Sequence, residues 1–454
     1  MARPRRAAPA RPHPVRIEAT SAPPLYASPL YAPAPADTPF VASPPLAEVT
    51  SFRERLLLIV IYVTVLASSV AFIEPSPHDA LMGVLAAACL IAGVRFDRRV
   101  LVLFMLLLIW NASGLFALTN VPEREKTIQY TATSIYLMIA AVMWACILAD
   151  NTLQRMAAIR SAYIFTAVLA AICGILGYFN VAGLGHLFSD YGRAMGAFKD
   201  PNVYGPFLIW PALVLMERML VRRISVIDVV ALGIIVVGLL LSFSRGAWAH
   251  FAVSAAIAVA LSFLTARDVS TRMRIFVMSA VAVGLMVAFI VILLSIPAIH
   301  KMFEVRAHLV QSYDVGQGGR FRLQEIALGA LLKYPNGMGP FEFARVNGLQ
   351  QHNVYLQAFL VYGWMGGVSY ILLLLTTFWV AFRSVFVATP WQNYTIIALA
   401  VFTGEVGESF IIDSDHWRHF FLLLGMVWGL WAATWRYKRQ RSAMAPPAWT
   451  ASPA

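Results

Sequence analysis

Long apolar stretches separated by short polar segments run along most of the chain and predict a bundle of membrane-spanning helices. Runs of about 17–25 apolar residues are long enough to cross about 30 Å of hydrocarbon as helix. In lipid they must be helical, because the bilayer offers the backbone no hydrogen-bond partner. We therefore predict an all-α integral membrane protein with about twelve transmembrane helices. The predicted spans lie near residues 55–73, 79–95, 99–118, 127–148, 156–178, 203–221, 226–243, 246–265, 273–296, 364–382, 394–411 and 417–435.

The two ends of the chain differ in composition from the part between them. Residues 1–50 hold 12 of the 25 prolines, a density that supports neither a helix nor a core. They contain no apolar segment typical of a signal peptide. We expect a disordered cytoplasmic tail at 1–50, with a docking segment as the alternative, a polytopic membrane domain at 51–440 and a disordered tail at 441–454.

The distribution of charge predicts the orientation. The chain is 59% hydrophobic and 13% charged, far less charged than a soluble protein. If the N-terminus is cytoplasmic, that side receives 23 of the 35 Lys and Arg but only 9 of the 23 Asp and Glu. This asymmetry predicts that both termini lie in the cytoplasm. It also explains the net charge of +12 without a nucleic-acid partner.

Polar residues collect at the predicted outer ends of the helices, whereas the span centres carry few charges. They lie in the loop 179–203, the turn 242–246, the long outer loop 297–352 between spans nine and ten, and the segment 405–420. Charges that move ions through a membrane usually lie near mid-span. The pattern therefore favours a site at the outer membrane–water boundary, and it places Glu405 and Glu408 at that boundary too.

The first two of these segments each offer cations. In "GRAMGAFKDPNVYG", Asp200 before a proline is typical of a helix N-cap, which places Arg193 and Lys199 near a helix N-terminus that favours anions. In "LLLSFSRGAWAHF", Arg245 lies in a turn held by helices on both sides. The alternative for each cation is an anchor that contacts lipid phosphates.

The long loop adds a helix and a histidine. The segment "RFRLQEIALGALL" has an apolar stripe at helical spacing and predicts a helix on or in the membrane surface, beginning with Arg320 and Arg322. Cations at a helix start oppose its dipole, a cost that an anionic ligand would offset. His352 with Asn353 begins a further helix, and its imidazole can exchange protons near neutral pH. A purely structural histidine is the alternative.

Together these segments resemble the O-antigen ligase and polymerase family of membrane transferases. The matching motifs are "RAMGAFKDPN" (193–202), "SFSRGAW" (242–248), "GGRFRLQEIALGALLKYPNGMGPFEF" (318–343) and "HNVYLQAFLVYGWMGG" (352–367), in the order that the family uses. The resemblance implies a GT-C-like fold in the inner membrane of a bacterial cell, with the loop 297–352 in the periplasm. It also implies a metal-independent, inverting glycosyltransferase without a cofactor. Its donor would be a glycan on undecaprenyl pyrophosphate, and its acceptor lipid A–core or a growing polysaccharide chain.

The resemblance also implies roles for residues. Arg245 resembles the family's arginine on the donor pyrophosphate, Arg193 and Arg320 its additional phosphate contacts, and His352 its base. Lys199 and Arg322 are weaker candidates for the same phosphate. The residue types fit, because arginine stabilises oxyanions and a positioned imidazole can accept the proton of an attacking hydroxyl.

Three rival interpretations remain open. The segment "DSDHWRH" supplies Asp413 and Asp415 together with His416 and His419, carboxylates and histidines that can hold a metal ion, and it also contains Arg418. The three cysteines, Cys89, Cys146 and Cys173, fall inside predicted spans, which disfavours a disulfide framework or a cysteine metal site. A flippase for the same lipid-linked glycan, or a non-catalytic component of polysaccharide assembly, would also be a membrane protein of this kind.

Overall fold

The computed structural model describes residues 51–122, 124–221, 224–307, 316 and 318–444. The tail predicted at 1–50 and residues 445–454 lie outside this part of the chain. The last helix continues to Met444, so residues 441–444 are helical.

The described residues form helices joined by short connections, with one two-stranded hairpin. The helices are α1 (Phe52–Leu66), α2 (Pro77–Ala92), α3 (Leu101–Ala117), α4 (Arg124–Leu148), α5 (Thr152–Tyr178), α6 (Gly185–Phe188), α7 (Pro201–Phe207), α8 (Ile209–Val221), α9 (Val226–Leu241), α10 (Arg245–Thr265), α11 (Val269–Leu294), α12 (Pro297–Ala307), α13 (Arg320–Lys333), α14 (Glu342–Asn347), α15 (Val354–Val385), α16 (Gln392–Glu408) and α17 (Arg418–Met444). Short 3-10 turns are η1 (Ala67–Ser69), η2 (Arg98–Val100), η3 (Leu118–Asn120) and η4 (Val181–Gly183). Strands β1 (Ser189–Asp190) and β2 (Arg193–Ala194) pair antiparallel.

A helix occupies each of the twelve stretches that the apolar pattern marks, with α7 and α8 sharing one of them. Seven helices in the described part of the chain are long and apolar enough to cross a membrane, and α2 and α9 are shorter apolar helices. The all-α membrane class is therefore confirmed, while the count of twelve spans and their orientation stay predictions.

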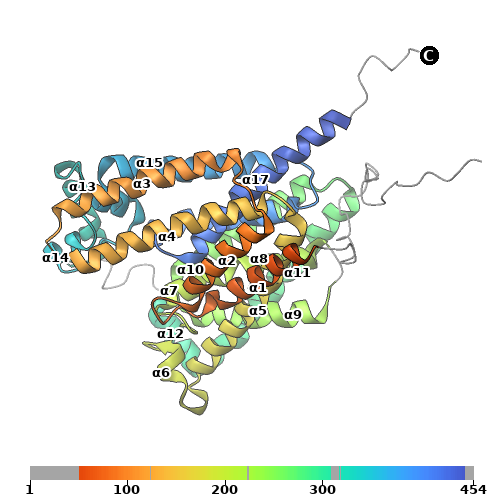
Figure 1. Ribbon diagram of the computed structural model, residues 1–454. Helices are drawn as coiled ribbons and strands as arrows, with labels where there is room; N and C mark the ends of the chain where they lie inside the picture. Colours follow the sequence, from red (N-terminus) through yellow and green to blue (C-terminus); the bar gives the residue numbers. More distant parts are fainter. Residues whose placement is uncertain (1–50, 123, 222–223, 308–315, 317, 445–454) are drawn as a thin grey trace, which may run out of the picture. The chain divides into compact units, whose positions relative to one another are not determined.

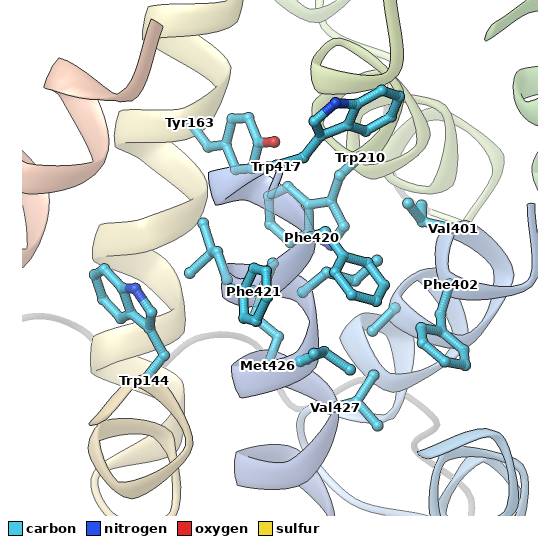
Figure 2. Close-up of a cluster of buried hydrophobic side chains, with 14 of the residues drawn as sticks. Trp144, Tyr163, Trp210, Val401, Phe402, Trp417, Phe420, Phe421, Met426 and Val427 are labelled. Atoms are coloured by element: carbon cyan, nitrogen blue, oxygen red, sulfur yellow. The ribbon is translucent and has the colours of Figure 1, made fainter. Parts of the chain in front are cut away.

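Pairs of helices far apart in sequence pack along each other. α3 lies along α15, α4 along α17 and α10 along α16, and the first of these pairs can be followed in Figure 1. Figure 2 shows part of the core around α17, where Phe420, Phe421 and Val427 lie between Trp144 of α4 and Phe402 of α16. α11 differs from these closely packed helices, because no residue in its most apolar part is buried in the protein. An apolar helix of that kind suits a lipid environment.

α15 is interrupted at Gly363, which adopts φ 71° and ψ −176°. The interruption exposes backbone groups that a continuous helix would pair internally. The segment before α14 pairs them instead: Met338 N–H donates to the Leu360 carbonyl at 2.6 Å, and Trp364 N–H donates to the Pro335 carbonyl at 2.8 Å. An added Cβ at Gly363 would lie 2.7 Å from the Pro335 oxygen. Only glycine therefore fits this close approach of two backbones.

Ion pairs join helix ends whose charges predict the cytoplasmic side. Arg155 of α5 donates to both carboxylate oxygens of Glu54 in α1 at 2.8 Å. Asp97, before η2, accepts from Arg436 of α17 at 2.6 Å and from Arg99 at 3.0 Å. These pairs fix the termini of helices that the apolar pattern alone does not position relative to one another.

Candidate functional site

Arg245 begins α10 directly after a tight turn. α9 ends at Leu241, Phe243 takes a left-handed conformation with φ 47°, and Ser244 caps α10 by accepting from Ala247 N–H at 3.4 Å. The predicted short turn is therefore present, with Arg245 as the first helical residue. A cation at this position is unfavourable toward the helix dipole and favourable toward a bound anion.

The hairpin brings Arg193 against the same turn. Its Nε donates to the backbone carbonyl of Ser242 at 2.8 Å, and its Nη2 donates to Asn202 Oδ1 at 2.7 Å. Asn202 lies in the first turn of α7, whose N-cap is Asp200, as predicted. Arg193 thus connects the start of α7 with the turn that carries Arg245, although the two arginines are 52 positions apart in the chain.

Lys199 is engaged elsewhere. Its Nζ forms an ion pair of 2.8 Å with Glu74, in the connection between α1 and α2, and both side chains are about half exposed. Lys199 therefore lies on an exposed surface, in an ion pair of a kind that contributes little to stability.

His352 is held by a carboxylate 61 positions further along the chain. Its Nδ1 lies 3.0 Å from Asp413 Oδ2, in the connection between α16 and α17. The next residue, Asn353, caps α15 by accepting from Leu356 N–H at 3.1 Å. Two more bonds tie this helix start to the end of α16: Val354 N–H donates to the Ser409 carbonyl at 3.0 Å, and Asn353 Nδ2 donates to the Phe410 carbonyl at 3.2 Å.

The predicted amphipathic helix is confirmed as α13, but its apolar stripe contacts protein. Leu323 and Ala327 are buried in a cluster with Phe343 of α14 and Leu360 of α15. Gln324 places its amide within 3.4 Å of the His352 carbonyl and 3.3 Å of the Phe410 carbonyl. α13 is therefore docked beside the histidine, which is why its stripe is not turned toward lipid.

The two arginines of α13 differ in environment. Arg320 is the first residue of the helix, half-buried, as the sequence predicts. Arg322 is exposed and forms an ion pair of 2.5 Å with Glu325 on the same helix. Of the two, Arg320 lies nearer the docked face, because Leu323 three residues later is buried.

Glu405 and Glu408 are buried within the protein, with 1% and 5% of their surface exposed, and their depth in the membrane stays a prediction. His250 of α10 faces them, with Nδ1 at 2.9 Å from Glu408 Oε2 and 3.9 Å from Glu405 Oε2. A histidine inside an apolar span was the signal for this cluster, because ionisable residues within spans rarely lack a role.

The residues of the segment "DSDHWRH" pair with one another or with other parts of the chain. Asp415 accepts from Tyr130 at 2.7 Å and lies 3.1 Å from His416 Nδ1, and Arg418 forms a bidentate pair with Asp79 at 2.7 Å. Burial raises the pKa of Asp415, but His416 and the hydrogen bond from Tyr130 outweigh it and hold the pKa below its usual value. Within the described residues no group of three or more His, Cys, Asp or Glu could hold a metal ion.

The cysteines play no part in this arrangement. All three are free thiols, Cys89 and Cys146 buried and Cys173 partly buried.

The fold and this polar end together define a polytopic α-helical membrane protein. Its candidate arginines, histidine and carboxylates lie at or near the ends of α7, α10, α13, α15 and α16. Hydrogen bonds join the start of α7 to the turn before α10, and the start of α15 to the end of α16. Residues 230–371 match the model of the O-antigen ligase family (Wzy_C). That segment contains Arg245, Arg320, Arg322 and His352 and covers just under a third of the chain. The match confirms the similarity to the O-antigen ligase and polymerase family of membrane glycosyltransferases. A comparison with curated proteins finds no match.

Proposed function

We propose that the protein transfers a glycan from undecaprenyl pyrophosphate to an acceptor hydroxyl at the periplasmic face of the bacterial inner membrane, with both termini in the cytoplasm. The acceptor is lipid A–core for a ligase, or the growing chain for an O-antigen or exopolysaccharide polymerase. The family match supports the class of reaction, and the site residues support its chemistry.

The contact that carries this proposal is the pair formed by His352 and Asp413. A carboxylate at 3.0 Å from Nδ1 favours a proton on that nitrogen, which leaves Nε2 as the acceptor for a proton. The acceptor hydroxyl must lose its proton as it attacks the anomeric carbon, and Nε2 takes it. His352 is partly exposed, with 42% of its side-chain surface accessible, so a substrate can reach it.

The arginines serve the leaving group. Cleavage of the glycosyl–phosphate bond builds negative charge on the pyrophosphate, and guanidinium groups stabilise such oxyanions through paired hydrogen bonds. The pyrophosphate is held by Arg245, Arg193 and Arg320. The more exposed Lys199 and Arg322 contribute further positive charge to the same phosphate. This charge stabilisation requires neither a metal ion nor a cofactor. A single displacement inverts the configuration at the anomeric carbon.

The experiment that tests this function compares wild type, Arg245→Ala and His352→Ala in a deletion strain at matched protein levels. Lipopolysaccharide is analysed by electrophoresis. Loss of long glycan from lipid A–core, together with accumulation of lipid-linked polymer, identifies a ligase. Ladders reduced to single repeats, or loss of exopolysaccharide alone, identify a polymerase. If both variants behave as wild type, neither residue has the proposed role.

A further inference from the structure

From its place at the end of α16, Glu408 contacts the turn that carries Arg245 and is joined through the chain to the segment that holds His352. On one side it faces the first turn of α10: a Cβ added to Gly246 would lie 2.7 Å from Glu408 Oε1 and 3.3 Å from its Cδ. Gly246 directly follows Arg245. The carboxylate therefore packs against the backbone that positions the arginine, in space that only glycine leaves open.

On the other side, Glu408 leads directly into the segment that holds the histidine. The next residue, Ser409, accepts from Val354 N–H, and Phe410 accepts from Asn353. The Glu408 carbonyl accepts from Ile411 N–H at 2.9 Å, which bends the chain back toward Asp413. Asp413 then reaches His352. Glu408 and the partner of the histidine thus lie five positions apart in the chain.

His250 fixes the side chain of Glu408 in this position. Its Nε2 lies 3.0 Å from the Val401 carbonyl, which can only accept, so Nε2 carries a proton. Its Nδ1 then shares one further proton with Glu408 Oε2 at 2.9 Å. Because both residues are buried, the pair is costly to break, and the carboxylate has one favourable orientation.

We propose that Glu408 is a positioning residue that couples the turn carrying Arg245 to the pair formed by His352 and Asp413. This inference rests on the proposed function and adds to it a buried residue that need not touch substrate. A shift of the α16 end would displace the arginine turn and the histidine start together. Displacements of about 1 Å can cost roughly a hundredfold in rate.

A double-mutant cycle between positions 246 and 408 tests the coupling. The variants are Gly246→Ala, Glu408→Ala, the two combined, and Glu408→Gln, which preserves shape and one hydrogen bond to His250. Gly407→Ala is the matched control, since a Cβ there meets nothing within 4 Å. Transfer is measured in the deletion strain at matched protein levels, and Tm is measured on purified full-length protein with and without undecaprenyl pyrophosphate.

We expect Gly246→Ala and Glu408→Ala each to lower transfer about tenfold or more and to reduce the rise in Tm caused by undecaprenyl pyrophosphate. In the Glu408→Ala background, Gly246→Ala should lower glycan transfer no further, because the added methyl then occupies the space that the Glu408 carboxylate has left. Glu408→Gln and Gly407→Ala should stay close to wild type. The proposal is overturned if the two losses multiply, or if Glu408→Ala transfers as wild type does.

Two outcomes separate this inference from other failures. If the Glu408→Ala protein does not accumulate, the test depends on Gly246→Ala. Glycan transfer equal to that of Gly407→Ala overturns the coupling, whereas a loss of transfer in Gly246→Ala but not in Gly407→Ala supports it. If Arg245→Ala and His352→Ala are inactive while the 246 and 408 variants are active, only the coupling is wrong. Active Arg245→Ala and His352→Ala variants would instead refute the proposed function.

Discussion

The guanidinium of Arg193 donates to the backbone carbonyl of Ser242 across 49 positions of sequence, at a distance of 2.8 Å. Its second bond, to Asn202, comes from a different helix. Arg193→Ala removes both bonds and a charge, so we expect transfer to fall by roughly tenfold to a hundredfold. Arg193→Lys preserves the charge but cannot form both bonds in the same geometry, and its transfer should lie between those of Ala and wild type.

The measurement for Arg193 is glycan transfer in the deletion strain at matched protein levels. Arg218→Lys is the control. Arg218 also pairs with another helix, at 3.2 Å from Asp228, but it lies in the last turn of α8, on the side that the charge distribution predicts to be cytoplasmic. Equal losses in the two Lys variants would show a general effect on folding and would argue against a role for Arg193 in transfer.

Asp413→Asn should weaken the base without changing its surroundings. Asn can donate as well as accept, so it no longer selects the tautomer of His352 that leaves Nε2 unprotonated. Loss of an orienting carboxylate of this kind typically costs about 10- to 100-fold in activity. The matched control is Glu304→Gln, which alters another histidine–carboxylate pair, at 3.3 Å from His300 on an exposed surface. Wild-type transfer by Asp413→Asn would exclude the orienting role.

The sequence predicts local features of this site well and tertiary ones poorly. The N-caps Asp200 and Asn353 and the start of α13 at Arg320 depend on neighbouring residues, and all three were predictable. The pairing of His250 with Glu408 joins residues 158 positions apart, and no periodicity encodes which helices become neighbours. For the same reason the sequence does not reveal that the apolar stripe of α13 packs on α14 and α15, while its position at the membrane surface stays a prediction.

Asp97 should make stability depend on pH in the acidic range. Burial raises the pKa of this carboxyl, but hydrogen bonds and positive charge from Arg436 and Arg99 outweigh burial and hold it below its usual value. The stabilisation is therefore complete above the unfolded pKa of about 3.9 and is lost as pH falls through the lower folded pKa. The Tm difference between wild type and Asp97→Asn should be constant from about pH 5 to 7 and shrink below about pH 4.

Asp150→Asn is the control for this pH dependence. Asp150 also contacts Arg436, at 3.5 Å, but its side chain is 68% exposed, and exposed pairs contribute little. We expect its Tm to follow wild type throughout. A Tm difference for Asp97→Asn that grows toward acid would contradict the assigned direction of the shift.

Gly363→Ala should destabilise the protein. The residue has φ 71°, unfavourable for any side chain, and an added Cβ would lie 2.7 Å from the backbone of Pro335 and of Asn336. We expect a loss of more than about 1 kcal/mol in the free energy of unfolding, measured by thermal unfolding of the purified protein. Gly233→Ala, a helical site in α9 with nothing within 4 Å, should be neutral or slightly stabilising. Equal Tm values for the two variants would refute the close approach.

The backbone bonds at the interruption of α15 also have a consequence for how this loop can vary. They close a ring from Pro335 to Trp364, and His352 lies inside that ring. The position of His352 thus depends on this short ring of chain and not on the whole length of the segment between α11 and α15. Residues ahead of α13 can then lengthen, shorten or change composition without moving His352. Relatives that differ there would keep the proposed base in the same place while the surface beside it varies.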